Sequence, residues 1–238
     1  MYRNCVLIVC NYEYLKVCEK EVRQNMKRCI IVGAGEFHEK AWKYEKADYL
    51  IAADGGFEYL RKLKIIPDML IGDMDSIKQE YVGSEMEIKK LPREKDDTDM
   101  LAAMKEGLAA GCKEFYIYGA LGGERIDHSI ANIQCLLYLH KHGAKGVLYG
   151  INDRIELLCN DKVCYPATME GILSVFAFGG DAKGVSEHGL KYSIQDAEMK
   201  MEFPIGISNE FIGQESMIEV KDGMLLLCIH AINGEKVM

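Results

Sequence analysis

The sequence predicts an α/β fold: a mostly parallel, Rossmann-like sheet with helices on both faces, followed by an all-β sandwich. Between residues 26 and 150, short apolar runs alternate with helix-like patterns, which is typical of parallel strands joined by crossover helices. After Gly150 only short β-like runs follow, separated by turn signals such as Gly179-Gly180-Asp181. We therefore expect an α/β nucleotide-binding domain at residues 26–150 and a β-sandwich domain at residues 151–238.

In the first domain, strands and helices are expected in alternation. Predicted strands cover residues 29–32, 49–53, 69–71, 87–91, 114–118 and 146–149. Predicted helices cover residues 37–45, 56–62, a segment from Thr98 to a stop at Gly111, and 127–140. The run at 87–91 is polar and ends at Pro92, which indicates an edge strand.

In the second domain, six short strands are expected, and the sequence shows no convincing helix. They cover residues 155–158, 172–177, 190–194, 199–203, 217–220 and 224–229.

Residues 1–25 do not fit this alternation of strand-like and helix-like segments. They hold one short β-like run and a polar stretch, and the α/β pattern begins only at Met26. We interpret them as an extension upstream of the functional start, with an extra edge strand as the alternative.

Composition argues against a nucleic-acid-binding protein. The net charge is −8 and no basic block is present, whereas nucleic-acid binding normally shows as a basic patch. Nucleotides stay possible ligands, because metal ions and backbone N–H groups can hold their phosphates.

The nine cysteines are scattered and include no C-x-x-C pair, so neither a zinc site nor a disulfide framework is indicated. No apolar run approaches the roughly 18 residues of a membrane span. We expect a cytoplasmic protein with reduced thiols.

Three acidic clusters follow strands or open a helix in residues 52–99. They are Asp54-Gly55-Gly56, Asp73-Met74-Asp75-Ser76 and Asp97-Thr98-Asp99. Loops after neighbouring parallel strands meet in one crevice, where gathered carboxylates repel one another unless a cation lies between them. Mg²⁺ suits such oxygen ligands and usually shares them with phosphates.

Each cluster taken alone has an ordinary explanation. The glycines after Asp54 fit a strand-to-helix turn, and Asp97 fits a helix N-cap. Asp73 and Asp75 fit a solvated loop equally well, although residues two apart in an extended segment point the same way and can reach one ion.

A fourth element joins them at residues 119–128. It follows a strand and opens a helix, so the backbone around Gly122 and Gly123 can approach an anion, and Arg125 adds a cationic fork suited to phosphate. Asp127 and His128 fit either this site or a helix cap. No Walker-type phosphate loop and no kinase glycine loop is present.

These motifs, in this order, resemble those of the thiamine pyrophosphokinase family. The resemblance covers Met26 to the C-terminus and adds two later motifs, Gly189-Leu190-Lys191-Tyr192 and Ile207-Ser208-Asn209-Glu210. It implies an α/β nucleotide domain, a β-sandwich, and a homodimer that binds thiamine between the α/β domain of one subunit and the sandwich of the other.

The resemblance also implies roles for individual residues. Asp73, Asp75 and Asp99 would hold Mg²⁺ against ATP, while Asp54 would face thiamine. Ser208 and Asn209 would recognise the thiamine pyrimidine from the partner subunit. The ATP-binding set would be Gly55, Gly56, Ser76, Lys95, Thr98, Gly122, Gly123, Arg125, Asp127 and His128.

The implied reaction moves diphosphate from ATP to the hydroxyethyl group of thiamine and releases AMP. Asp54 or a metal-organised carboxylate would act as the base. One departure from the family pattern is Glu124, which precedes Arg125 and affects where that side chain lies. The aromatic residue that stacks on thiamine stays unassigned; Phe211 and Tyr192 are the nearby candidates.

Two rival functions remain at this point. The Asp73-x-Asp75 pair alone also fits a metal-dependent sugar-nucleotide glycosyltransferase, which leaves the other motifs unused. A non-catalytic thiamine- or nucleotide-binding protein is the second alternative, against which the intact acidic set argues.

Overall fold

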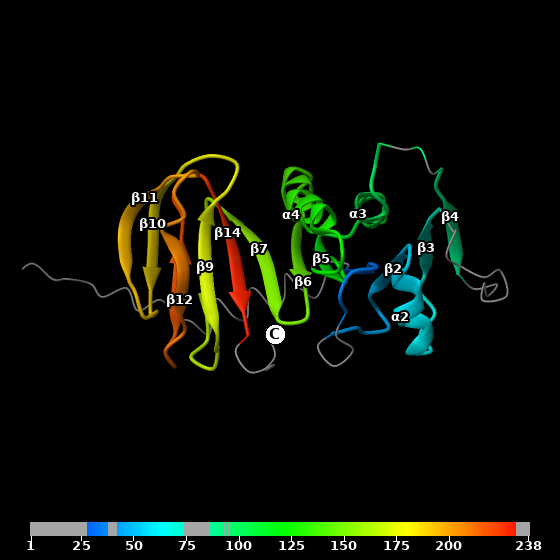
Figure 1. Ribbon diagram of the computed structural model, residues 1–238, viewed down its shortest axis with the longest axis horizontal. Coiled ribbons are helices and arrows are strands. Elements are labelled where there is room, and N and C mark those ends of the chain that lie inside the picture. The colour runs from blue at the N-terminus through cyan, green and yellow to red at the C-terminus, as the bar shows by residue number, and fades with distance from the viewer. Residues whose placement is uncertain (1–27, 38–41, 74–85, 93, 95, 232–238) are drawn as a thin grey trace, which may run out of the picture.

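The computed structural model describes residues 28–37, 42–73, 86–92, 94 and 96–231. Within these ranges, the strands form one sheet of ten strands and one of four. Figure 1 shows the larger sheet running along the length of the molecule. The fold is therefore mixed α/β with a second, antiparallel sheet, as the sequence predicts at this level.

Six of the ten strands of the larger sheet are parallel to one another, and β1 lies near the middle of this parallel part. Its described strands are β1 (Arg28–Val32), β2 (Tyr49–Ala53), β3 (Met69–Gly72), β4 (Glu87–Lys90), β5 (Glu114–Tyr118) and β6 (Lys145–Tyr149), in the spatial order β6-β5-β1-β2-β3-β4. Ile31 of β1 pairs with Ile51 on one side and Ile117 on the other. The strands on one side of β1 (β2, β3 and β4) therefore come before the strands on its other side (β5 and β6) in the chain.

Helices lie on both faces of this parallel part, and the strands are correspondingly apolar. They are α2 (Gly56–Lys62), α3 (Asp99–Ala109) and α4 (Ile126–Lys141). Ile30 and Val32 share a core with Leu60 of α2. Ile31, which points the other way, shares a core with Met104 of α3 and Leu136 of α4.

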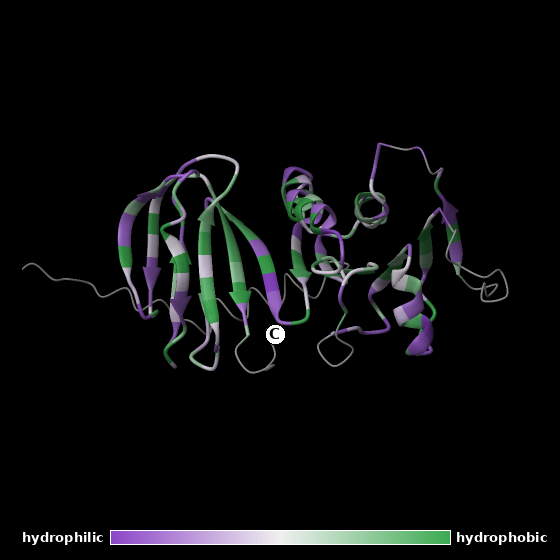
Figure 2. Cartoon of the chain, in the orientation of Figure 1, coloured by the Kyte–Doolittle hydropathy of each residue, from purple (hydrophilic) through white to green (hydrophobic). Residues whose placement is uncertain are grey.

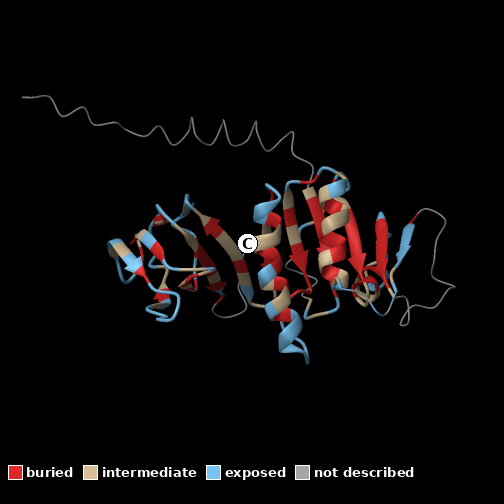
Figure 3. Ribbon diagram, turned by 90° about the horizontal axis from the view of Figure 1, so that it is seen from above, coloured by how far each residue is buried: buried red, intermediate tan, exposed pale blue. Residues whose placement is uncertain are grey.

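β4 forms the outer edge of the sheet, as its polar sequence predicts. All four of its residues are exposed, and it is hydrophilic in Figure 2, whereas the neighbouring β3 is buried along its whole length. Figure 3 shows the same contrast, with buried residues concentrated in the inner strands.

The sheet continues past residue 150 with antiparallel strands. These are β7 (Asp153–Cys159), β9 (Ile172–Ala177), β12 (Gly206–Glu210) and β14 (Met224–His230), in the order β12-β9-β14-β7. β7 pairs with β6 through Leu148 and Ile155, so backbone hydrogen bonding runs across the connection at residues 150–152.

A second sheet packs against this antiparallel part. Its described strands are β8 (Lys162–Tyr165), β10 (Ala182–His188), β11 (Ile194–Met199) and β13 (Ser216–Glu219), in the order β11-β10-β13-β8. Leu225 and Leu227 of β14 share a core with Val185 of β10 and Ile218 of β13. Leu226, which points the other way, belongs to the core beneath α3 and α4.

One predicted element of residues 26–150 is wrong where the chain is described. A helix was expected at residues 37–45, but residues 42–45 are not helical, and 38–41 lie outside the described residues. Trp42 instead packs its ring 5.8 Å from Phe37 and 5.3 Å from Tyr44. The aromatic residues of this segment therefore pack as a cluster against the core beside α2. The predicted extension at residues 1–25 also lies outside the described residues.

Two predicted strands after residue 150 are wrong. Residues 190–193 form only a single bridge, from Leu190 to Phe211, and residues 200–203 lie beyond the end of β11. β8, β10, β11 and β12 were not predicted; in β10, β11 and β12 the polar residues break the alternation that marks a strand. In β10 the polar Glu187 is itself buried, and no local pattern indicates that.

The six described cysteines are free thiols. Burial raises the pKa of Cys135 to about 11 and has the same effect on Cys228, so both are protonated core residues at neutral pH. Among the described helices, none is both long and apolar enough to cross a membrane.

Candidate active site

The carboxyl ends of the parallel strands define one edge of the sheet, and most predicted site residues lie along it. Asp54 follows β2, Asp73 follows β3 and the Gly119 loop follows β5. The order of the strands reverses direction between β1 and β5, and a crevice for ligands forms at such a point.

Two glycine-containing loops flank this crevice and hold each other in place. The backbone N–H of Gly33 donates to Tyr118 O at 2.8 Å, and that of Gly35 donates to Gly119 O at 2.8 Å. A Cβ on Gly119, where φ is 62°, would lie 2.3 Å from Gly33 O. Gly33 and Gly35 were not assigned to the site from the sequence; the Gly-x-Gly after the first strand was the available signal.

Asp54 occupies a left-handed turn, with φ at 48°. Its backbone N–H donates to Ile71 O at 2.8 Å, which ties the turn to β3. A Cβ on Gly72 would lie 3.2 Å from Asp54 Cα, so the backbones that lead to Asp54 and Asp73 pass close together. The two carboxylates therefore begin from adjacent points on the edge.

The glycines after Asp54 have a clear packing role. A Cβ on Gly56 would lie 1.9 Å from Val32 O, so only glycine lets α2 start this close to β1. Gly55 is the N-cap of that helix. Both glycines thus set the position of the Asp54 turn.

The third acidic cluster opens α3. Thr98 is the N-cap, and its Oγ1 accepts a hydrogen bond from Leu101 N at 3.1 Å. Asp97 pairs with Lys105 at 2.5 Å between Oδ2 and Nζ, while Asp99 lies in the first turn. The cluster is therefore a helix start with one carboxylate committed to an ion pair.

The predicted metal site is only partly within the described residues. Asp75, Ser76 and Lys95 lie outside them. In the part of the chain that is described, no three acidic, His or Cys side chains come close enough to hold a metal. Asp73 and Asp99 supply hard oxygen donors, the donor type that Mg²⁺ requires.

At the start of α4, a loop with left-handed glycines leads to Arg125. Gly122 and Gly123 have φ of 72° and 82°. The Arg125 guanidinium forms an ion pair with Asp127, and both side chains are mostly exposed. Hydrogen bonding from Arg125 lowers the pKa of Asp127. His128 is exposed and its backbone N–H donates to Arg125 O at 3.2 Å.

Asn132 fastens this loop from the second turn of α4. Its buried side-chain amide donates to Ala120 O at 2.7 Å. The sequence analysis did not identify it; a polar residue on the buried face of α4 was the signal. Asn132 positions the Gly119–Gly123 loop against the helix.

Ser208 and Asn209 lie on β12, at the same edge but far along it. Hydrogen-bonded strand pairs connect β5, β6, β7, β14, β9 and β12 in that order. At about 4.8 Å for each step, they lie roughly 24 Å from β5 and roughly 29 Å from β1. Within one chain, the structure therefore does not bring them to the acidic loops.

The Asn209 side chain is fully hydrogen bonded within the chain. Its Oδ1 accepts from the backbone N–H groups of Tyr192 and Glu210, each at 3.0 Å. Its Nδ2 donates to Glu187 Oε2 and to Tyr192 O, each at 2.7 Å. Ser208 is exposed, with φ at 60°, and its backbone N–H donates to Ser174 Oγ.

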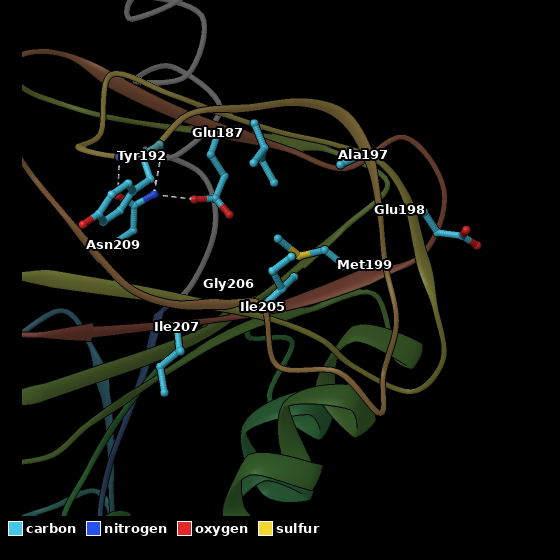
Figure 4. A pocket seen from close by; sticks show the side chains of 10 residues that line it. Glu187, Tyr192, Ala197, Glu198, Met199, Ile205, Gly206, Ile207 and Asn209 are labelled. Carbon is cyan, nitrogen blue, oxygen red and sulfur yellow. Dashed lines mark hydrogen bonds between the residues drawn. The ribbon is translucent and has the colours of Figure 1, made fainter.

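A pocket of about 150 Å³ opens beside Asn209, between β10, β11 and β12 (Figure 4). Its lining is mostly apolar. The residues that line it are Glu187, Tyr192, Ile194, Ala197, Glu198, Met199, Ile205, Gly206, Ile207 and Asn209. Of the two aromatic residues near this region, Tyr192 faces the pocket, while Phe211 packs edge-on against Tyr165 at 5.4 Å between centroids.

Comparison with family models matches both halves of the chain to one family. Residues 39–148 match the model "Thiamin pyrophosphokinase, catalytic domain", and residues 162–225 match "Thiamin pyrophosphokinase, vitamin B1 binding domain".

Individual relatives agree. A thiamine pyrophosphokinase of Bacillus subtilis (strain 168) is 30% identical over 189 residues, which cover 74% of this chain and 85% of the relative. Thiamine pyrophosphokinase 2 of Oryza sativa subsp. japonica is 29% identical over 196 residues, covering 76% and 71%. The crystal structure of the Bacillus subtilis thiamine pyrophosphokinase superposes with a TM-score of 0.76 at 24% identity, covering 86% of this chain and 99% of that one.

Proposed function

This chain belongs to the thiamine pyrophosphokinase family, and we propose that it transfers diphosphate from ATP to thiamine, giving thiamine diphosphate and AMP. The observation that carries the proposal is the pair of family matches, which cover a catalytic and a vitamin B1 binding domain in order along one chain. The glycosyltransferase alternative is not favoured, because it leaves the second of these domains without a role.

In the proposed reaction, the hydroxyethyl oxygen of thiamine attacks the β-phosphorus of ATP. A new O–P bond forms, the bond from the β-phosphorus to the α,β-bridging oxygen breaks, and AMP leaves. The hydroxyl proton passes to a base at the carboxyl edge. Asp54 is our candidate for this base, with a metal-organised carboxylate as the alternative, because its turn places it between β2 and β3 in the crevice.

Asp73, Asp75 and Asp99 are proposed to hold Mg²⁺. When bound, the ion would neutralise charge on the ATP phosphates. Asp73 and Asp99 supply carboxylate oxygens at this edge, which supports their part in the set. Holding the nucleotide so that its β-phosphorus faces thiamine is then the main task of the chain.

The phosphates are proposed to lie between the glycine loops and the start of α4. There Gly122 and Gly123 expose backbone N–H groups and the helix N-terminus favours an anion. Arg125 would exchange its ion pair with Asp127 for the phosphate. The remaining proposed nucleotide contacts are Gly55, Gly56, Ser76, Lys95, Thr98 and His128.

We propose that the complete site needs two copies of the chain. Ser208 and Asn209, the proposed thiamine contacts, lie roughly 24–29 Å from the glycine loops within one chain. Apolar side chains are exposed near both regions, at Ile126 and Ile130 of α4 and at Phe203, Ile205 and Ile207 near β12. A homodimer would cover these surfaces and join the two regions.

The finer architecture is also proposed. We infer a Rossmann-like nucleotide domain at residues 26–150 and a thiamine-binding β-sandwich at 151–238. The change from parallel to antiparallel pairing at β6 and β7 supports this division. Residues 1–25 are proposed to be an extension, and the protein is proposed to act in the cytoplasm.

The direct test is AMP formation from ATP and Mg²⁺, with and without thiamine, for the wild type and Asp73→Asn. Thiamine-dependent AMP release that falls at least roughly 100-fold in the variant would support diphosphate transfer and the role of Asp73. Release of ADP in place of AMP would mean attack on the wrong phosphorus, and the proposed reaction would be wrong. Tight thiamine binding by the wild type without turnover would favour a non-catalytic binding protein.

A further inference from the structure

One carboxylate of the C-terminal half is buried inside the protein. Glu187 is 3% exposed and lies on β10, between its partners Ile194 on β11 and Ile218 on β13. Burying a carboxylate is costly unless hydrogen bonds or a cation replace its water. The hydrogen-bond partners of Glu187 therefore show how far this cost is offset.

Glu187 has one hydrogen-bond partner in the described chain. Its Oε2 accepts from Asn209 Nδ2 at 2.7 Å, and the two backbone N–H groups bound to Asn209 Oδ1 fix that amide in this orientation. Among the described residues, no Lys, Arg or His pairs with Glu187, and its Oε1 accepts no hydrogen bond. Burial raises the pKa of Glu187, opposed only by the hydrogen bond from Asn209.

Other carboxylates nearby do have cationic partners. Glu210 pairs with Lys191 at 2.7 Å, Glu198 pairs with Lys200 at 2.8 Å and Glu156 pairs with Arg154 at 3.0 Å. Glu187 thus differs from these carboxylates both in burial and in having no cationic partner among the described residues.

The free oxygen faces the pocket. In Figure 4, Oε2 meets Asn209 while the other oxygen points away from it, toward the space bounded by Met199 and Ile205. A volume of about 150 Å³ is enough for one aromatic ring, since an engineered apolar cavity of roughly that size binds benzene. The pocket therefore offers an apolar enclosure for a ring and one acceptor for a donor on it.

We propose that Glu187 determines which pyrimidine this site accepts, by taking a hydrogen bond from the exocyclic amino group of the substrate ring seated in this pocket. The inference rests on the proposed function, which supplies thiamine as the substrate. A carboxylate can only accept, so it selects an amino group over a carbonyl at that ring position. Besides lining the pocket as a proposed thiamine contact, Asn209 then holds Glu187 in position through its side-chain amide.

The test compares two ligands that differ at one substituent. Oxythiamine has a carbonyl where thiamine has the amino group. We expect the wild type to bind thiamine roughly 10- to 100-fold more tightly than oxythiamine, the range for a hydrogen bond to a charged group. In Glu187→Gln the amide oxygen can keep the bond from Asn209, which leaves an NH₂ facing the pocket. Binding of thiamine should weaken by a similar factor. The preference for thiamine should be lost or reversed, because the amide NH₂ can donate to the carbonyl of oxythiamine.

Glu210→Gln is the matched control. This substitution removes the carboxylate of Glu210, the residue next to Asn209 in the chain. That carboxylate is half-exposed and paired with Lys191. The variant's preference for thiamine should match that of the wild type. Ala197→Phe, which fills the pocket from β11, should abolish binding of both ligands and gives a second readout if Glu187→Gln does not fold.

The inference is overturned if Glu187→Gln keeps the wild-type preference, or if Ala197→Phe binds thiamine normally. Calorimetric binding without ATP measures these affinities, and AMP release from the same samples separates the two proposals. If the wild type releases AMP but Glu187→Gln keeps the wild-type preference for thiamine, only the proposed role of Glu187 is wrong. If the preference for thiamine depends on Glu187 but no AMP is released, the proposed reaction is wrong, while the proposed role of Glu187 in binding the ring still stands.

Discussion

The two ends of the large sheet present carboxylates in opposite ways. At the parallel end, Asp54, Asp73 and Asp99 lie in loops or at a helix start, where backbone turns place them. At the antiparallel end, Glu187 lies near the end of β10 and is buried, with its carboxylate bonded to Asn209 of the other sheet. The first set is positioned by local backbone geometry, and the second by tertiary packing. Substitutions at the two ends of the sheet are therefore expected to change activity and stability in different ways.

The largest effect is expected where two backbones of the parallel end touch. In Gly119→Ala, the new Cβ would lie 2.3 Å from Gly33 O, and both glycine loops must move. We expect AMP release to fall by roughly 100-fold, as misplacing a site by about 1 Å can do. The left-handed φ alone costs about 1–2 kcal/mol of stability, and the clash adds to it.

Gly111→Ala separates these two causes. Gly111 also has a positive φ, of 84°, but nothing lies within 4 Å of its added Cβ. It should lose only about 1–2 kcal/mol in urea unfolding and keep its activity. Equal effects of the two substitutions would show that loop contact is unimportant.

A smaller effect is expected for Asn132→Ala, which removes the side-chain bond to Ala120 O. The variant should lose about 1–3 kcal/mol of stability, because a buried carbonyl is left without its donor, and AMP release should fall with it. Gln134→Ala, at an exposed position of the same helix, is the control and should stay within about 0.5 kcal/mol. Similar losses in both variants would rule out a specific role for Asn132.

At the antiparallel end, Glu187→Gln should raise the thermal midpoint of the ligand-free protein at neutral pH. Burial raises the folded-state pKa of Glu187. The folded protein therefore binds more protons than the unfolded chain just above the unfolded pKa, and stability falls as pH rises through the folded pKa. Thermal unfolding between pH 4 and 8 should show a smaller decline in the variant than in the wild type. A lower midpoint at pH 7 would contradict this account.

The smallest effect is expected for Asp127→Asn. Its pKa is lowered by Arg125, so the ion pair contributes above the unfolded pKa and is lost as pH falls through the folded one. Because both partners are mostly exposed, the thermal midpoint should hardly change. A clear loss of stability in low-salt buffer that disappears in 1 M salt would show that exposed charges matter more than this comparison implies.

The sequence predicted the parallel end well, because each strand there is a short apolar run followed by a turn residue with its own local reason. The helix start around Thr98 and the strand at 49–53 are examples that the structure confirms. The cap itself was assigned to the wrong residue, because Thr98 caps the helix while Asp97, the expected N-cap, pairs with Lys105. Asp54, Gly55 and Gly56 were found for the same reason, although their roles stay proposals.

The antiparallel end was predicted less well. β10 and β12 carry polar residues whose burial depends on strands distant in the chain, such as Asn209 beneath Glu187. Glu187 was not identified at all, because nothing in Gly184-Val185-Ser186-Glu187 distinguishes a buried carboxylate from an exposed one. The separation of Asn209 from the acidic loops is likewise a property of strand order, which local sequence does not determine.

The central claim is that the two ends of the sheet form one site between two copies. The most direct test pairs Asp73→Asn on one copy with Ala197→Phe on the other, each variant being inactive alone. The two are co-expressed with different tags and purified through both. The mixed dimer should recover about half of the wild-type AMP release, because one of its two shared sites is intact. An inactive mixed dimer, or failure to purify one, would contradict a site shared between copies.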